Sequence, residues 1–372
     1  MRNCGFEVVT MSADGKEVGD IIKDGVRHIA IPFTRKVTPF QDLKCLWRLI
    51  LEIKKLRPDI VHTHTPKAGL LGMLASWICD VPVRMHTVAG LPLMESSGLK
   101  RKVLEISERV TYACAHKIYP NSFGLKKFIQ DHFHVPDKKI KIIGKGSSNG
   151  IDTVFFDRSP QLEIRAREIR QQHKISLNDF VFSFVGRIVR DKGIVELIEA
   201  FQKVSEDFAS LHPGKKAFLL LVGPFEHDLD PLPQHIYDCA MDDKHIILAG
   251  FQQDIRPWLI ASDVFVFPSY REGFPNVVMQ SSLLKVPCIV SDINGCNEIV
   301  QQNKTGVIVP SKDVGALVKA MKELVVDDVK RQNFGQLARD FVAANFKREI
   351  IWEELKKEYE ATLKLKASKR RE

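Results

Sequence analysis

The stretch VFVFPSYREGFPNVVMQSSLLK (264–285) decides the fold, because it joins a strand to a helix through one short turn. Its first residues, VFVFPS (264–269), are almost continuously apolar, which is typical of a strand buried on both faces of a sheet. The turn Tyr-Arg-Glu-Gly follows, and Pro275 suits the first position of a helix over 275–285. A strand that leads directly into a helix predicts a unit of a parallel α/β sheet.

The same alternation of strand and helix extends along the whole chain. In the first half we expect strands at 6–12, 27–33, 59–65, 81–88 and 139–144, and helices at 42–56, 69–78 and 99–115. In the second half we expect strands at 180–188, 217–223, 245–251, 264–269, 287–293 and 305–310, and helices at 193–204, 254–261, 275–285 and 313–326. This pattern predicts parallel sheets covered by helices on both faces.

A stretch containing Ser, Asn, Gly, Asp and Pro, SSNGIDTVFFDRSP (147–160), marks the junction between the two halves. A chain of 372 residues is long enough for two domains of ordinary size. We therefore predict an α/β protein with two Rossmann-like, doubly wound domains that face across a cleft. Their bounds are 1–152 and 153–345, and a C-terminal helix with a basic tail (346–372) packs back towards the first domain.

Composition is that of a soluble globular protein. No apolar stretch approaches the roughly 20 residues that cross a bilayer, and the start lacks the apolar segment of a signal peptide. We therefore expect a cytoplasmic location. The seven cysteines are scattered without a C-x-x-C pair, which favours reduced thiols over metal or disulfide roles.

The net charge of +9 lies entirely in the first half. Residues 1–152 contain 24 Lys and Arg against 15 Asp and Glu, whereas the remainder contains 31 of each. A basic half indicates an anionic partner. Nucleic acid and an anionic membrane both fit this charge, and a basic surface without a partner is the alternative.

Ligands of doubly wound sheets bind beyond the carboxyl ends of the strands. In the second half this rule selects the loops GRIVRDKG (186–193), GPFEHD (223–228), SYREG (269–273) and SDINGCNE (291–298). The first loop has three cations within six residues beside a helix start, an arrangement suited to phosphate. Helix-flanking charges in solvent are the alternative interpretation of that loop.

The loop SYREG places a carboxylate, Glu272, directly before Gly273. The glycine lets a ligand approach the backbone, and the amides of Gly273 and Phe274 lie where a phosphate would bind at a helix start. Glu272 would repel a phosphate but suits hydrogen bonds to sugar hydroxyls, unless it only favours the helix dipole. A phosphate site next to such a carboxylate describes a nucleotide sugar.

The segment FVGRIVRDKG (184–193), followed about eighty residues later by PSYREGFPNVVMQ (268–280), resembles the donor-site signature of retaining, GT-B-fold glycosyltransferases of family 4. Further segments that resemble the family are DIVHTHTPKAGLLG (59–72), AHKIYPNSFGLKKFI (115–129), NGIDTVFF (149–156), ASDVFVFPS (261–269) and SDINGCNEIV (291–300). The resemblance extends over nearly the full chain in the family's order.

The resemblance implies catalytic roles for three residues. In the loop that begins at Gly186, Arg187 and Lys192 match the pair that neutralises the donor diphosphate. Glu272 matches the first acid of the family's E-x7-E motif, which touches the transferred sugar.

The remaining donor-binding positions also follow from the resemblance. Gly273 and Phe274 match residues whose backbone amides approach sugar and phosphate. The second acid of the motif, which binds the ribose hydroxyls, falls on Gln280. Its amide still accepts and donates hydrogen bonds, and the lost charge costs ~1 kcal/mol of binding.

The chain departs from the family pattern at a histidine. Many relatives have His before a Gly in the first domain, where this chain has Ala89. His86, three residues earlier, and His62 and His64 are weaker candidates, because an isolated His in an apolar strand is more often a core residue than a catalyst.

A further departure concerns the start. Relatives begin with a strand, a Gly-rich loop and a helix before the strand that matches FEVVTMS (6–12), and this chain lacks them. We therefore expect a first domain without its first strand, whose neighbours lose their pairing partners. Either translation starts upstream, or this form has an incomplete acceptor site.

The resemblance implies retaining transfer of a sugar, from a UDP-sugar, to a hydroxyl of a glycan or a polyprenyl-diphosphate-linked glycan. Bacterial capsule or lipopolysaccharide synthesis is the expected setting. We expect no cofactor and no obligate metal, because Arg187 and Lys192 supply fixed positive charge and no D-x-D pair lies at a strand end.

Among partners we expect no nucleic acid and a peripheral contact with the anionic inner face of the cell membrane. The basic run Lys100, Arg101 and Lys102, with Leu99, Val103, Leu104 and Ile106 beside it, suits such a contact. An ordinary surface helix is the alternative.

Other functions on two α/β domains fit less well. A nicotinamide-dependent oxidoreductase needs G-x-G-x-x-G between a strand and a helix, and the near match GKGSSNG (144–150) precedes no clear helix. A nucleotide-sugar epimerase and an inert nucleotide-sugar-binding protein remain the alternatives.

Overall fold

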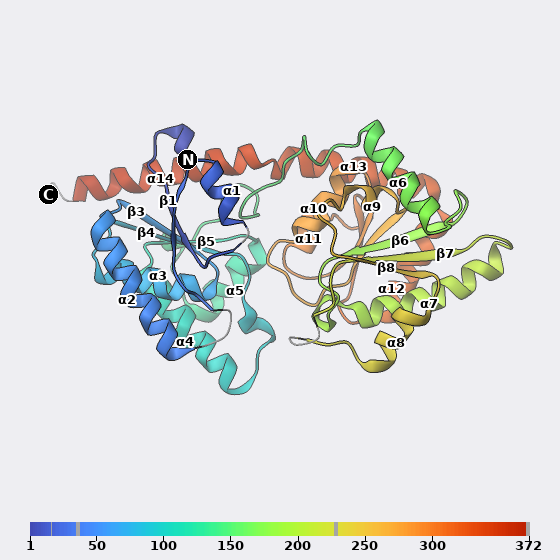
Figure 1. Ribbon diagram of the computed structural model, residues 1–372, viewed down its shortest axis with the longest axis horizontal. Coiled ribbons are helices and arrows are strands. Elements are labelled where there is room, and N and C mark those ends of the chain that lie inside the picture. Colours follow the sequence, from blue (N-terminus) through green and yellow to red (C-terminus); the bar gives the residue numbers. More distant parts are fainter. Residues whose placement is uncertain (16, 35–37, 227–229, 370–372) are drawn as a thin grey trace. The chain divides into compact units, whose positions relative to one another are not determined.

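The computed structural model describes residues 1–15, 17–34, 38–226 and 230–369. The chain divides into two compact units, Met1–Asn149 with Glu349–Glu372, and Gly150–Arg348. Each unit contains parallel strands flanked by helices (Figure 1), which confirms the predicted α/β class with parallel sheets in two domains.

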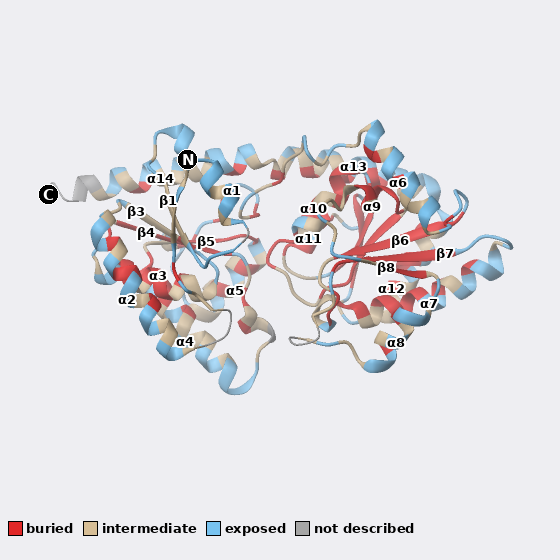
Figure 2. Cartoon of the chain, in the orientation of Figure 1, coloured by how far each residue is buried: buried red, intermediate tan, exposed pale blue. Residues whose placement is uncertain are grey.

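The second unit is built on a six-stranded sheet in the order β11-β10-β9-β6-β7-β8, in which every pair is parallel. The strands are β6 (Phe180–Val185), β7 (Ala217–Val222), β8 (Ile246–Gly250), β9 (Val264–Phe267), β10 (Cys288–Ser291) and β11 (Gly306–Val309). Every residue of the four central strands is buried (Figure 2). Burial on both faces explains why these strands are continuously apolar.

The helices of the second unit are α6 (Pro160–Gln172), α7 (Ile194–Leu211), α8 (Gln234–Asp242), α9 (Arg256–Ile260), α10 (Asn276–Leu283), α11 (Cys296–Ile299), α12 (Val314–Val326) and α13 (Asp328–Phe346). One prediction is wrong in detail. Pro275 is the N-cap of α10 rather than its first residue, because its ψ of 110° is extended, and the helix begins at Asn276.

The first unit contains two separate parallel sheets. β1 (Val9–Ser12) pairs with β2 (Arg27–Ala30), while β3 (Ile60–His64), β4 (Val83–Val88) and β5 (Lys117–Pro120) form the other sheet. No strand of the described residues joins the two.

The strand predicted at 139–144 is wrong. Only Ile140 makes a bridge, to Ile118 of β5. Gly144 and Gly146 have φ angles of 58° and 112°, which a strand does not allow.

The helices of the first unit are α1 (Val18–Lys23), α2 (Pro39–Leu56), α3 (Pro66–Ile78), α4 (Gly98–Cys114), α5 (Phe123–Phe133) and α14 (Arg348–Lys369). Short 3-10 segments are η1 (Arg2–Cys4), η2 (Pro92–Glu95) and η3 (Asp137–Lys139) here, and η4 (Arg190–Lys192) in the second unit.

Helix α3 packs against both α2 and α4. From α14, Ile351 packs with Val83 and Met85 in one buried cluster. Within the described part of the chain, no helix is both long and apolar enough to cross a bilayer.

One buried acid on α4 makes stability depend on pH. Glu108 is 3% exposed, and burial raises the pKa of its carboxyl to about 7. The folded state therefore keeps a proton that the unfolded state loses above its pKa of 4.5, so stability falls as pH rises through this window. Glu108→Gln should raise the free energy of unfolding at pH 8 by ~3 kcal/mol and leave it unchanged near pH 4.

Calorimetric unfolding across this pH range tests the prediction. Glu105→Gln on the same helix is the control, because Glu105 is ion-paired with Arg101 and His132 and its removal should give no gain at high pH. An equal change for Glu108→Gln at both pH values would contradict it.

Candidate functional site

Three adjacent strands of the second unit bring most of the predicted donor-site residues to one edge of the sheet. Strands β9, β6 and β7 are neighbours and parallel, so the loops that follow them emerge together. Gly186, Arg187 and Lys192 follow β6, and Glu272 follows β9. The parallel order thus joins residues that are some eighty positions apart in sequence.

A lysine–carboxylate ion pair lies at the centre of this edge. Lys192 Nζ contacts Glu272 Oε1, and the two side chains are only 15% and 18% exposed. Ser269 Oγ also lies within hydrogen-bonding distance of the same carboxylate oxygen, at 3.3 Å. The pair therefore consists of a predicted phosphate-binding cation and the predicted sugar-binding acid.

A second cation, Arg187, is held by the loop that follows β7. Its Nη1 donates a hydrogen bond to Glu226 Oε2 at 2.7 Å. Burial acts to lower the pKa of the Arg187 guanidinium, but Glu226 and the nearby Asp191 and Glu272 carboxylates together raise that pKa. Arg187 is therefore charged at every physiological pH.

Sequence reasoning selected the loop 223–228 but not Glu226 within it, because no spacing rule shows which residue of a loop faces its neighbour. Residues 227 and 228 of that loop lie outside the described part of the chain.

Two glycines allow the loops to approach one another. A Cβ on Gly193 would lie 2.1 Å from the carbonyl oxygen of Pro268, and its φ of 71° favours glycine. A Cβ on Gly223 would lie 1.8 Å from the carbonyl oxygen of Gly186. The first contact joins the β6 loop to the β9 loop, and the second joins it to the β7 loop.

Arg271, next to the central pair, has a different partner. Its Nη2 donates to Asp191 Oδ2 at 2.8 Å, and the backbone N–H of Asp191 donates to Asp230 Oδ2 at 2.6 Å. Arg271 therefore links the β9 loop to η4, the turn that carries Lys192. Neither Asp191 nor Asp230 was predicted as a site residue.

The other predicted donor-site residues are placed less directly. Gly273 and Phe274 are buried, and the Phe274 ring packs on Phe346 with centroids 5.1 Å apart. A Cβ on Gly295 would lie 2.4 Å from the Gly273 carbonyl oxygen, so the loop after β10 covers this turn. Gln280 lies half-buried in α10, and its side chain makes no hydrogen bond to the ion pairs among the described residues.

The histidine of β4 is a core residue. His86 is 2% exposed, and its Nδ1 lies 2.8 Å from the Thr63 hydroxyl. A Cβ on Gly69 would lie 2.4 Å from the ring, which shows how closely α3 covers it. Burial lowers the pKa of His86 to about 4, so the ring is neutral at pH 7.

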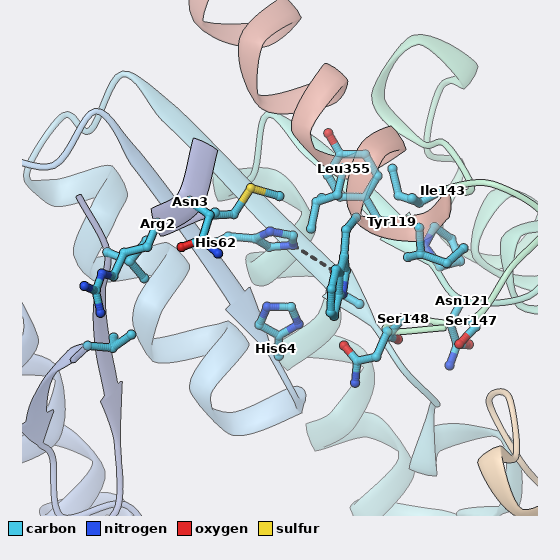
Figure 3. A pocket seen from close by; sticks show the side chains of 18 of the residues that line it. Arg2, Asn3, His62, His64, Tyr119, Asn121, Ile143, Ser147, Ser148 and Leu355 are labelled. Atoms are coloured by element: carbon cyan, nitrogen blue, oxygen red, sulfur yellow. Dashed lines mark hydrogen bonds between the residues drawn. The ribbon is translucent and has the colours of Figure 1, made fainter. Parts of the chain in front are cut away.

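The two histidines of β3 instead line a pocket in the first unit. The pocket has a volume of about 630 Å³, and His62 and His64 stack in its wall with ring centroids 4.5 Å apart. His62 is held by the Tyr359 hydroxyl at 2.7 Å and the Thr87 hydroxyl at 2.8 Å. Figure 3 shows the pair beside Tyr119, Asn121, Ser147 and Ser148, with Ile143 and Leu355 supplying apolar surface.

The two α/β units with their parallel sheets have the GT-B fold. The structure is similar to a glycosyltransferase from Rickettsia africae (TM-score 0.77, 20% identity, 98% of this chain and 92% of that chain covered). It is equally similar to Anabaena HepE in complex with UDP (TM-score 0.77, 17% identity, 96% and 100% covered).

Family models cover most of the sequence. Residues 165–341 match the model of glycosyl transferases group 1, and residues 1–155 match that of glycosyltransferase family 4. The chain belongs to these group 1 and family 4 glycosyltransferases, as the motifs predicted.

Two bacterial relatives match the chain over most of its length. The Staphylococcus aureus capsular polysaccharide biosynthesis glycosyltransferase CapM is 35% identical over 364 residues, which is 98% of this chain and 92% of the relative. An Escherichia coli UDP-Gal:α-D-GlcNAc-diphosphoundecaprenol α-1,3-galactosyltransferase is 30% identical over 336 residues, 88% of this chain and 82% of the relative. Both relatives are glycosyltransferases and at least 30% identical to this chain, so the chain is a glycosyltransferase of the same family.

Proposed function

We propose that the chain transfers a sugar from a UDP-sugar to a hydroxyl of a lipid-linked glycan at the cytoplasmic face of the membrane, with retention of anomeric configuration and without a metal ion. The observation that carries this proposal is the meeting of Arg187, Lys192 and Glu272 at the ends of adjacent parallel strands. UDP and a diphosphoundecaprenol-linked acceptor are favoured because the name of the E. coli relative specifies both.

The proposed role of the two cations is to lower the barrier of the reaction. That barrier is cleavage of the bond between the anomeric carbon and the diphosphate. Negative charge develops on the leaving diphosphate as that bond breaks. Arg187 and Lys192 would stabilise this charge, together with backbone amides of the turn at Gly273 and Phe274. This fixed positive charge supports transfer without a metal ion.

The proposed role of the Glu272 carboxylate is to bind the transferred sugar. In the structure Glu272 contacts Lys192, and a bound diphosphate would compete for the lysine. Glu272 would then accept hydrogen bonds from hydroxyls of the transferred sugar. The acceptor oxygen would form its bond to the anomeric carbon on the face that the diphosphate leaves, and its proton would pass to a phosphate oxygen of the leaving group.

The pocket of the first unit is the proposed acceptor site. Its wall combines the polar groups of His62, His64 and Asn121 with the apolar surface of Ile143 and Leu355, a mixture suited to a sugar ring. Burial and the neighbouring His64 and His86 lower the pKa of His62 well below its ordinary value. A neutral His62, with both ring nitrogens held by the Tyr359 and Thr87 hydroxyls, would form a rigid part of the pocket wall on which His64 stacks.

Incubation with a panel of UDP- and GDP-sugars and an undecaprenyl-diphosphate-linked acceptor tests the proposal. We expect transfer only when acceptor is present, from a UDP-sugar, with the anomeric configuration of the donor retained in the NMR spectrum of the product and with no loss on adding EDTA. A product of inverted configuration would contradict retention. Loss of activity with EDTA would contradict transfer without a metal ion. Epimerised donor in the absence of acceptor would contradict the assignment as a transferase.

A further inference from the structure

Helix α2 presents large apolar side chains to solvent. The outward face of α2 consists of Phe40, Leu43, Trp47 and Leu51, whose side chains are 51–93% exposed. These positions lie opposite Cys45, Leu49 and Ile53, which are buried against the unit. The helix is therefore apolar on both sides. A helix on the surface of a water-soluble protein normally carries polar residues outward, so this face needs another explanation.

Helix α4 repeats the pattern in the same helical layer. The outward face of α4 consists of Leu99, Val103 and Ile106, which are all exposed. Helix α3 packs between the two helices, and Trp77 and Ile78 at its end are exposed as well. The neighbouring Cys79 Sγ lies 3.7 Å from the carbonyl oxygen of Ile50, which places this end of α3 against α2.

Cations flank both apolar faces. They are Lys44, Arg48, Lys54 and Lys55 on α2, and Lys100 and Lys102 on α4, all exposed. In the described ranges of the chain, none of the six makes an ion pair with an acidic side chain. Exposed Trp and Leu edged by unpaired Lys and Arg are the composition of helices that lie in the interface of an anionic membrane.

We propose that the outward faces of α2 and α4 form a docking surface for an anionic lipid bilayer, with Trp47 and Leu51 inserted among the acyl chains. This deepens the proposed function, on which it rests for the lipid-linked acceptor. Charge favours a bilayer over a second copy of the chain, because pairing two such faces would bring their unpaired cations together. The sequence pointed to α4, but α2 exposes the larger aromatic surface.

Sedimentation of the full chain with lipid vesicles tests the docking surface. We expect binding to mixed phosphatidylglycerol–phosphatidylcholine vesicles, weak binding to phosphatidylcholine alone, and a decrease with added salt. The double variant Trp47→Asp/Leu51→Asp should bind ~10- to 100-fold more weakly because charge replaces inserted apolar surface. Lys44→Glu/Arg48→Glu should also weaken binding about tenfold or more, without removing apolar surface.

The matched control is Leu177→Asp, which replaces an 81% exposed leucine in the second unit and should leave vesicle binding unchanged. Calorimetry with UDP on the same proteins separates the two proposals. The docking surface is refuted if the wild-type chain binds UDP but does not bind the vesicles. It is also refuted if the α2 variants bind the vesicles as well as the wild-type chain does. In both cases the proposed function stands. A wild-type dimer that Trp47→Asp/Leu51→Asp dissociates, without vesicle binding, would refute the bilayer in favour of a second copy. A failure to bind UDP would count against the proposed function alone.

Discussion

Replacing Glu272 with Gln is expected to lower kcat for sugar transfer by ~10²- to 10³-fold, the usual effect of removing one group that stabilises a transition state. Gln keeps the size of the side chain but removes the negative charge. That charge pairs with Lys192 and would align the hydroxyls of the bound sugar. The amide oxygen of Gln can still accept a hydrogen bond from Lys192, so Lys192 keeps a partner in a pair whose side chains are only 15% and 18% exposed, and the unfolding temperature should fall only slightly. Steady-state kinetics and thermal unfolding of the same preparation test this.

The control for this substitution is Glu323→Gln, which removes another lysine-paired carboxylate of the second unit, the partner of Lys330. It should leave kcat unchanged. Normal transfer by Glu272→Gln would remove the carboxylate from the proposed mechanism, whereas a large loss of thermal stability would assign Glu272 to the fold instead.

The sequence was sufficient for the parts of the structure that depend on hydrophobic pattern. The four central strands of the second unit are buried on both faces, so their apolar runs were unambiguous, and each one was found within a few residues of its predicted bounds. The rule that ligands bind beyond strand ends also placed Arg187, Lys192 and Glu272 on one edge. These residues meet because β9 and β6 are neighbours in the sheet, so the loops that follow the two strands lie side by side.

The sequence was not sufficient where partners are chosen in three dimensions. Glu226 and Asp191 pair with the arginines at the site, yet both lie in loops that have no periodicity. The segment 139–144 resembled a strand in composition, but glycines with positive φ end it. The outward face of α2 was also missed, because an apolar helix gives no sign of which side remains exposed.

Replacing Arg187 with Ala is expected to weaken UDP binding by ~10- to 100-fold, which corresponds to one charge-assisted hydrogen bond of about 1.5–3 kcal/mol. The guanidinium is anchored by Glu226 at 2.7 Å, so it is held in place before a ligand arrives and little entropy is lost on binding. Uridine carries no phosphate and should bind the variant as it binds the wild-type chain. Calorimetry with UDP and saturation-transfer NMR with uridine measure the two affinities.

The comparison of two ligands makes the test specific for phosphate. A distorted site would weaken UDP and uridine equally, and that result would refute the assignment of Arg187 to the diphosphate. Arg165→Ala is the matched control, because Arg165 forms a similar single contact of 3.1 Å with Asp254 in the same unit, and its loss should change neither affinity. The double variant Arg187→Ala/Glu226→Gln removes the possibility that an unpaired Glu226 repels the phosphates. It should still bind UDP more weakly than the wild-type chain, since Lys192 and the backbone amides alone compensate less of the diphosphate charge.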